Sequence, residues 1–168
     1  MTDKPSAVNA EGISEPFAVE SVPWQDWSEG SRYGSRFRYL SAFGGASHVG
    51  VAMEELAPGM ESSLNHYHML EEEQALIVAG EMTLKLGDKT YPVKTGDYVC
   101  FPAGQKAGHS FYNHSNEPCR FLIIGEKNPH DVIVYPETGR VSVRLTGEGY
   151  DKSATMEYWQ GADMERKR

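Results

Sequence analysis

From residue 47 onward, short segments of alternating apolar and polar residues follow one another, and each is closed by residues that favour turns. Ala57–Gly59 ends the first segment, Gly87 marks a tight connection, and Pro102–Gly104 ends a later segment. Strands this short, at such even spacing, predict an antiparallel sandwich or barrel and argue against alternating strands and helices. The expected strands are Ser47–Leu56, Glu61–His68, Gln74–Ala79, Glu81–Leu86, Thr90–Val93, Asp97–Phe101, His109–Asn113 and Cys119–Ile124, with a further pair at Val132–Tyr135 and Val141–Arg144.

The two flanks of this strand-rich region have different patterns. Residues 1–23 are rich in Ser, Glu, Pro and Ala and lack periodicity, which predicts a flexible N-terminal arm. Trp24–Tyr39 carries large aromatic residues in a polar stretch, and we expect an irregular segment that packs on a barrel wall or a partner subunit. Residues 147–168 predict a short helix or a docked C-terminal tail. A single all-β domain is therefore expected over residues 24–146.

Composition and charge narrow the class of protein. The 168 residues are 39% hydrophobic and 24% charged, which fits one soluble globular domain. No apolar run approaches the roughly 18 residues of a membrane helix, and residues 1–16 lack the apolar part of a secretory signal, so we expect a cytoplasmic protein without membrane contact. The net charge of −8 disfavours nucleic-acid binding. Cys100 and Cys119 are too few for a disulfide framework, and Cys100, within the apolar run 98–101, is expected to be buried and unreactive.

The tripeptide His66-Tyr67-His68 suggests metal chemistry. On a strand, residues two apart point to the same face, so both imidazoles are expected on one side and Tyr67 on the other. Glu73 follows five residues after His68, which is far enough to turn a corner and meet the imidazoles from the next strand. Nitrogen and oxygen donors of this kind suit one divalent Fe, Mn, Ni, Co or Zn ion.

These residues belong to two motifs that resemble those of the cupin superfamily. The first motif, G-x5-HxH-x3,4-E-x6-G, corresponds to Gly59, His66, His68, Glu73 and Gly80, with one extra residue after Gly59. The second motif, G-x5-PxG-x2-H-x3-N, corresponds to Gly96, Pro102, Gly104, His109 and Asn113, with four residues in place of two before His109.

The resemblance implies a cupin-type double-stranded β-helix, that is, a small antiparallel β-barrel. It also carries the role of metal ligand to His66, His68, Glu73 and His109. Asn113 is instead expected to cap a neighbouring turn. Because small barrels of this superfamily commonly pair through their N-terminal strands, the resemblance further implies a homodimer.

Strand parity predicts which residues share the metal face and form the walls of a pocket. The pocket is expected to be small and largely apolar, as suits a small organic ligand. Its predicted walls are Ser62, Leu64, Ala75, Ile77 and Phe111. No catalytic residue is identified, although Tyr98, Lys85 and Gln74 are candidates for an acid or base. Glu71 and Glu72, in the loop before Glu73, are expected to be solvated.

Three functions are compatible with this site. The first is a metal-dependent enzyme on a small organic molecule, either an oxygenase such as a dioxygenase or a lyase or isomerase that uses the ion as a Lewis acid. The second is a non-catalytic binding or sensing module, which the absence of a recognisable catalytic partner would suit. The third is a metal-free storage-type or sugar-epimerase barrel, which the complete ligand set disfavours.

Overall fold

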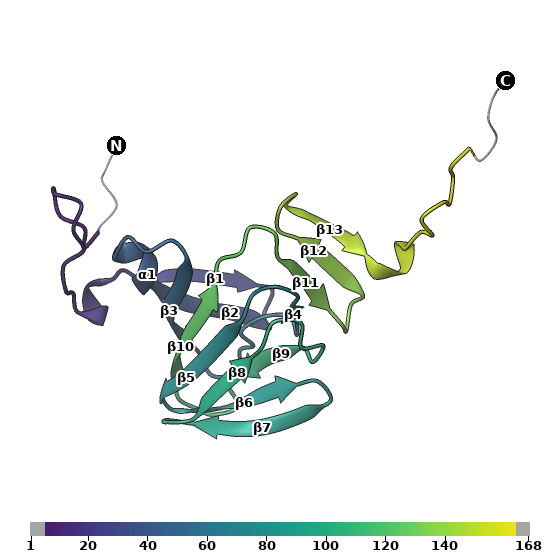
Figure 1. Cartoon of the computed structure of the whole chain (residues 1–168). Coiled ribbons are helices and arrows are strands. Elements are labelled where there is room, and N and C mark those ends of the chain that lie inside the picture. The colour runs from purple at the N-terminus through teal and green to yellow at the C-terminus, as the bar shows by residue number, and fades with distance from the viewer. Residues whose placement is uncertain (1–5, 164–168) are drawn as a thin grey trace.

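The computed structural model describes residues 6–163, and almost all of their regular structure is β-strand (Figure 1). The all-β class and the antiparallel barrel predicted from the sequence are confirmed, because all pairings between the named strands are antiparallel. Residues 1–5 of the expected arm and 164–168 of the expected tail lie outside the described residues. No helix in the described part of the chain is long and apolar enough to cross a membrane.

Three sheets make up the structure, and short helices connect some of the strands. The largest sheet has the order β1 (Gln25–Glu29), β2 (Tyr33–Tyr39), β3 (Val49–Leu56), β10 (Cys119–Glu126), β5 (Glu73–Ala79) and β8 (Tyr98–Phe101). The second has the order β7 (Lys89–Lys94), β6 (Glu81–Leu86) and β9 (His109–Tyr112). The third has the order β13 (Glu148–Asp151), β12 (Arg140–Val143), β11 (Val132–Tyr135) and β4 (Tyr67–His68). The helices are η1 (Val19–Ser21), α1 (Leu40–Phe43) and η2 (Lys152–Ala154).

The N-terminal aromatic segment is regular, which corrects the prediction of an irregular stretch. Residues of Trp24–Tyr39 form the hairpin β1–β2, and β2 continues the large sheet by pairing with β3. The turn between the two strands contains Gly30, whose φ of 61° suits a tight connection. Tyr33, Phe37 and Tyr39 lie two or four residues apart, as expected for one face of a strand.

The segment predicted as one strand, Glu61–His68, is a strand only at Tyr67–His68. Its pairing is divided among different partners: Glu61 bridges to β2 and β9, His66 bridges to His109, and β4 pairs with β11. A chain that changes partner every few residues must bend, so it cannot keep one continuous ladder. This bend places His66 and His68 at the corner where the barrel meets the small C-terminal sheet.

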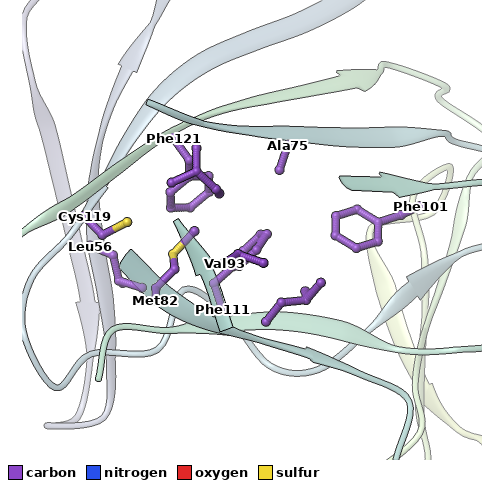
Figure 2. Packing of buried hydrophobic residues seen from close by; sticks show 10 residues of the cluster. Leu56, Ala75, Met82, Val93, Phe101, Phe111, Cys119 and Phe121 are labelled. Atoms are coloured by element: carbon purple, nitrogen blue, oxygen red, sulfur yellow. The ribbon is translucent and has the colours of Figure 1, made fainter. Parts of the chain in front are cut away.

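The core lies between the two larger sheets, inside the barrel. Leu56, Met82 and Phe121 are at most 1% exposed, and Figure 2 shows their side chains pointing toward one another. At the corner between β5 and β6, Gly80 has φ of 82°, and an added Cβ would lie 3.2 Å from the Cys119 backbone. Glycine at this corner therefore lets β10 pack closely. Cys100 is exposed, which corrects its expected burial, because Val99 and Phe101 are the residues that face inward.

Asn113 connects three backbone segments at the end of β9. It is fully buried, and Nδ2 donates to the carbonyl oxygens of Leu56 and Glu117, both at 2.8 Å. Its Oδ1 accepts from the Ser115 N–H at 3.0 Å, which confirms the predicted role in capping a turn.

We expect Asn113→Ala to lower the free energy of unfolding by about 3 kcal/mol, because it leaves buried carbonyl groups without donors. Urea denaturation monitored by circular dichroism measures this change. Asn116→Ala, at an exposed position three residues along, serves as the control and should leave the midpoint almost unchanged. Equal midpoints for the two variants would contradict the assigned role of Asn113.

The C-terminal part projects from the barrel as the sheet β11–β13 (Figure 1). The strand pair predicted at Val132–Tyr135 and Val141–Arg144 is present, as β11 and β12. The predicted tail adds a strand, β13, and the short helix η2. Residues 155–163 are exposed throughout, so within the described part of the chain this tail is not docked on the barrel.

Candidate metal centre

Four side chains predicted as ligands come from three neighbouring places on the barrel. His68 is in β4, Glu73 begins β5, and His109 begins β9. His66 precedes β4 and exchanges two backbone hydrogen bonds with His109. The His66 N–H donates to the His109 carbonyl oxygen at 3.2 Å, and the His109 N–H donates to the His66 carbonyl oxygen at 2.7 Å. The structure therefore brings together all four residues that the motifs singled out.

The three imidazoles converge on one carboxylate oxygen of Glu73. Glu73 Oε2 lies 3.0 Å from His109 Nε2, 3.3 Å from His68 Nε2 and 3.9 Å from His66 Nε2. The ligand atoms of His66, His68 and Glu73 all lie within 4.8 Å of one another. Three imidazole nitrogens of the same type thus face a common point beside a carboxylate.

In two of the three imidazoles, the Nδ1 atom, on the side of the ring away from Glu73, has a hydrogen-bond partner. His66 Nδ1 lies 2.8 Å from the Leu64 carbonyl oxygen, and His68 Nδ1 lies 2.6 Å from Asp131 Oδ2. A carbonyl or carboxylate partner fixes the proton on Nδ1 and leaves the Nε2 lone pair for a metal. The His109 ring is instead held by stacking on Phe101, with ring centroids 3.8 Å apart.

Charges within the cluster are strongly coupled. Burial, reinforced by nearby His109, lowers the pKa of His66 to about 4, so this imidazole is neutral at pH 7. Burial also opposes a charge on His68, but contacts with Glu73 and Asp131 prevail and raise the pKa of His68 to about 9. Although burial disfavours its charge, the neighbouring His109 and His68 side chains hold the pKa of Glu73 far below its usual range. Binding of a cation would therefore displace a proton from His68.

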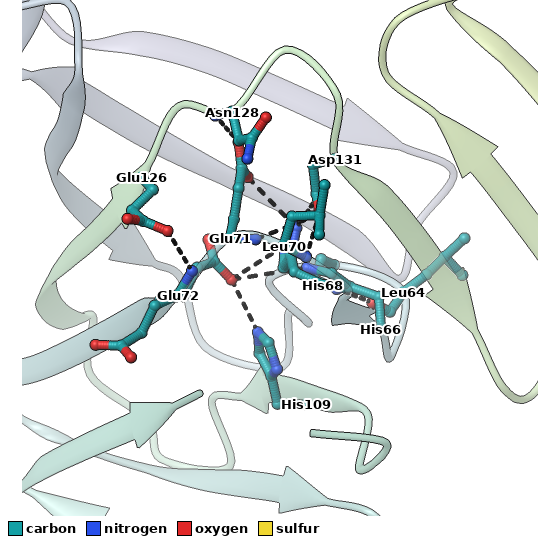
Figure 3. A network of polar contacts seen from close by, with 12 residues as sticks. Leu64, His66, His68, Leu70, Glu71, Glu72, His109, Glu126, Asn128 and Asp131 are labelled. Atoms are coloured by element: carbon teal, nitrogen blue, oxygen red, sulfur yellow. Dashed lines mark hydrogen bonds and ion pairs between the residues drawn. The ribbon is translucent and has the colours of Figure 1, made fainter. Parts of the chain in front are cut away.

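A buried polar network supports His68 from the C-terminal side (Figure 3). Asp131 is fully buried, and its Oδ1 accepts from the backbone N–H groups of Leu70 at 2.9 Å and Glu71 at 3.3 Å. Glu71 is only 2% exposed, which corrects the prediction that it is solvated. It accepts from the Asn128 N–H and from Arg144, both at 2.6 Å, whereas Glu72 is exposed as expected.

The donor set fits a divalent transition metal. His68 Nε2 is buried, points toward Glu73 and makes no hydrogen bond within the described residues, so a cation there would satisfy it. Three imidazole nitrogens and one carboxylate oxygen are the ligands that Fe, Mn, Ni, Co and Zn accept. His66, His68, Glu73 and His109 are the residues that would hold the ion.

The comparisons with known proteins agree with the fold and the motif. Residues 52–125, from β3 through β10, match the family described as the cupin domain. The chain carries a cupin domain. A comparison with curated proteins found no match.

Solved structures resemble this chain over most of its length. A sugar phosphate isomerase candidate from Acidithiobacillus ferrooxidans has a TM-score of 0.76 and 27% identity, over 89% of this chain and 94% of its own. A sugar phosphate isomerase from Silicibacter pomeroyi has a TM-score of 0.75 and 27% identity, over 84% of this chain and 95% of its own. A predicted oxalate decarboxylase from Thermotoga maritima has a TM-score of 0.58 and 22% identity, over 68% and 100% of the chains, and shows the shared fold.

A cavity of about 290 Å³ reaches the candidate metal centre at Glu73. Its walls combine apolar side chains of the large sheet, including Phe37 and Ile123, with the charged groups of Lys127 and Arg144. The pocket walls predicted from the sequence do not line this cavity. Ala75, Ile77 and Phe111 pack in the barrel core, Ser62 is buried and accepts from the Phe111 N–H, and Leu64 is half-buried, so their role at a ligand stays a prediction.

The acid–base candidates inferred from the sequence do not belong to this cavity. Tyr98 is 53% exposed and hydrogen-bonds to Gln74, whose position on β5 alternates with that of Glu73 and so lies on the outer face. Lys85 forms an exposed ion pair with Glu137. The sequence thus identified the four side chains that the structure brings together and missed both Asp131 and Glu71. No local sequence pattern predicts the roles of those two residues. Asp131 reaches His68 only because β11 pairs with β4.

Proposed function

We propose that this cupin is a metal-dependent enzyme that isomerises a small phosphorylated hydroxy-aldehyde or hydroxy-ketone. The convergence of three imidazoles on the Glu73 carboxylate, beside a cavity, carries the proposal. An ion held by these residues would act as a Lewis acid that polarises the carbonyl group of a substrate. Two solved structures named as sugar phosphate isomerases, each 27% identical to this chain, favour this reaction over the oxygenase and lyase alternatives.

The residues of the cavity support a small anionic substrate. Lys127 and Arg144 are the basic residues of a wall that also contains Glu71, Glu73 and Glu126, and their side chains would donate hydrogen bonds to a phosphate group. Arg144 is fixed by its ion pair with the buried Glu71, so its guanidinium has a defined position. Phe37 and Ile123 supply apolar surface for the carbon skeleton.

Anaerobic reconstitution with each candidate metal, followed by elemental analysis and assays on aldose and ketose phosphates of three to six carbons, tests the proposal. We expect one ion per chain and interconversion of at least one aldose–ketose pair. His66→Ala should abolish turnover, whereas His48→Ala, at an exposed histidine outside the site, should not change it. A protein that retains no metal, or that consumes oxygen with the iron form and isomerises nothing, would overturn the proposal.

A further inference from the structure

Glu54 is a buried carboxyl group that faces the inside of the barrel. It lies in the middle of β3, opposite Phe37 of β2 on one side and Phe121 of β10 on the other. Residues directly opposite each other on neighbouring strands share a face, and Phe121 belongs to the hydrophobic core. The Glu54 side chain, only 5% exposed, therefore projects inward from a wall that is otherwise apolar.

No positive group compensates this carboxyl within the described part of the chain. Its Oε1 atom is buried and has no hydrogen-bond partner there, and only the Ser35 hydroxyl forms a hydrogen bond with the carboxyl. The adjacent Glu55 has the opposite environment, since it points outward and is held by Arg36 and Arg120. A buried carboxyl without a charged partner lowers the stability of the fold, whereas a leucine at the same position would not. The presence of Glu54 in the core therefore suggests a functional role.

Burial makes Glu54 a weak acid. The apolar surroundings, together with the negative charge of Glu73, raise the pKa of Glu54 to about 8, although the Ser35 hydrogen bond works against this rise. An acid whose pKa lies near neutrality can both accept and return a proton at the pH of the cell. Ser35 remains available for this contact because it accepts from Trp27 Nε1 at 2.9 Å and can direct its own proton to Glu54.

Glu54 adjoins the cavity that reaches the metal centre. Phe37, its cross-strand neighbour, and Ala52, the preceding inward-facing residue of β3, both line this cavity, as does Glu73. The cavity therefore runs along the inner face of the large sheet, from the ligand Glu73 toward the position of Glu54. A substrate that fills it would lie beside Glu73 and reach Phe37 and Ala52, the two residues that flank Glu54 on the same face of the sheet.

We propose that Glu54 is the general acid–base that moves a proton between the two carbon atoms of the substrate. The ionised carboxyl would take the hydrogen of the carbon beside the carbonyl group as a proton, and the C–H electron pair would form the C=C bond of an enediolate. A proton would then shift between the two adjacent substrate oxygens. Protonated Glu54 would return its proton to the former carbonyl carbon as the new carbonyl forms, which regenerates the carboxylate. This inference rests on the proposed isomerase function.

Infrared spectroscopy tests the position of Glu54 independently of turnover. At pH 6, the wild type and Glu55→Gln are expected to show the carbonyl stretch of a protonated buried carboxyl, and Glu54→Gln is expected to lack it. Addition of glycolate, a non-reacting hydroxy acid, to the metal-loaded protein should shift this band. A band that is absent, or that stays unchanged at saturating or highest attainable glycolate, would overturn the inference.

Hydrogen exchange tests the reaction itself. With the metal-loaded protein and dihydroxyacetone phosphate in D₂O, nuclear magnetic resonance measures the exchange of the carbon-bound hydrogen. We expect Glu54→Gln to slow this exchange by about a hundred-fold or more with unchanged metal content, whereas Glu55→Gln should match the wild type. Exchange by Glu54→Gln at the wild-type rate would reject Glu54. Loss of metal or of exchange in the wild type would instead reject the proposed isomerase, and with it the acid–base role of Glu54, whatever the infrared band shows about its protonation.

Discussion

Replacement of Glu73 by glutamine is expected to abolish metal retention. The Glu73 carboxylate lies within 3.9 Å of the Nε2 atoms of His66, His68 and His109, and it is the sole negative group at their common point within the described residues. Glutamine keeps the size of the side chain but removes the charge that attracts a cation and holds His68 in place. We expect the affinity for the ion to fall at least about a thousand-fold, which corresponds to roughly 4 kcal/mol.

Competition with a coloured chelator measures this affinity, and circular dichroism verifies that the variant is folded. Glu72→Gln offers a matched control, because Glu72 precedes the ligand by one residue and is exposed. Its metal affinity should equal that of the wild type. If Glu73→Gln retained the ion as tightly as Glu72→Gln, the assignment of Glu73 as a ligand would be wrong.

Removal of the Asp131 carboxylate is expected to damage both the site and the fold. Asp131→Ala leaves His68 Nδ1 and the backbone N–H groups of Leu70 and Glu71 without their acceptor in a fully buried position. We expect a loss of about 3 kcal/mol in the free energy of unfolding, because buried donors would remain unsatisfied. Metal affinity should fall by about 10- to 100-fold, as is typical when the group behind a ligand histidine is lost.

Denaturation of the metal-free protein separates the effect on stability from the effect on metal binding. Asp131→Asn keeps an oxygen acceptor for the backbone N–H groups, so it should recover much of the stability but little of the metal affinity. Asp88→Ala, in an exposed turn, is the control and should change neither property. A fully stable Asp131→Ala protein with unaltered metal affinity would contradict the described network.

The barrel and the convergence of the four proposed ligands were predictable because their signals are local. Alternation along short strands indicated the sheets, and the two-residue spacing of His66 and His68 was enough to predict their common face. The burial of Glu54 could also have been predicted from the alternation along β3, since Glu54 lies two residues from both Ala52 and Leu56. It was missed because a carboxyl residue is normally expected to be exposed. The same parity would have placed Cys100 outside, between the inward-facing Val99 and Phe101.

The unpredicted part of the site depends on contacts between distant segments. Asp131 follows His68 by 63 residues, and Arg144 follows Glu71 by 73 residues. No pattern in the intervening sequence predicts that β11 pairs with β4. The hairpin β1–β2 was missed for a different reason: its aromatic residues suggested surface packing, although they also alternate along a strand that extends the large sheet.

The pairing of β4 with β11 makes the C-terminal hairpin part of the candidate metal centre, although the hairpin lies beyond the matched cupin region. Residues 52–125 contain every proposed ligand, yet the groups that orient His68 and position Glu71 come from Asp131 and Arg144. Opening of the hairpin would break the contact between Asp131 and His68. A metal ion that binds only when this contact is formed would therefore make the opening less frequent. Metal binding should therefore slow amide hydrogen exchange in β11, which pairs with the His68 strand β4, and also in β12, which contains none of the proposed ligands. A chain that ended at residue 126 would keep the four ligands and lose their preorganisation.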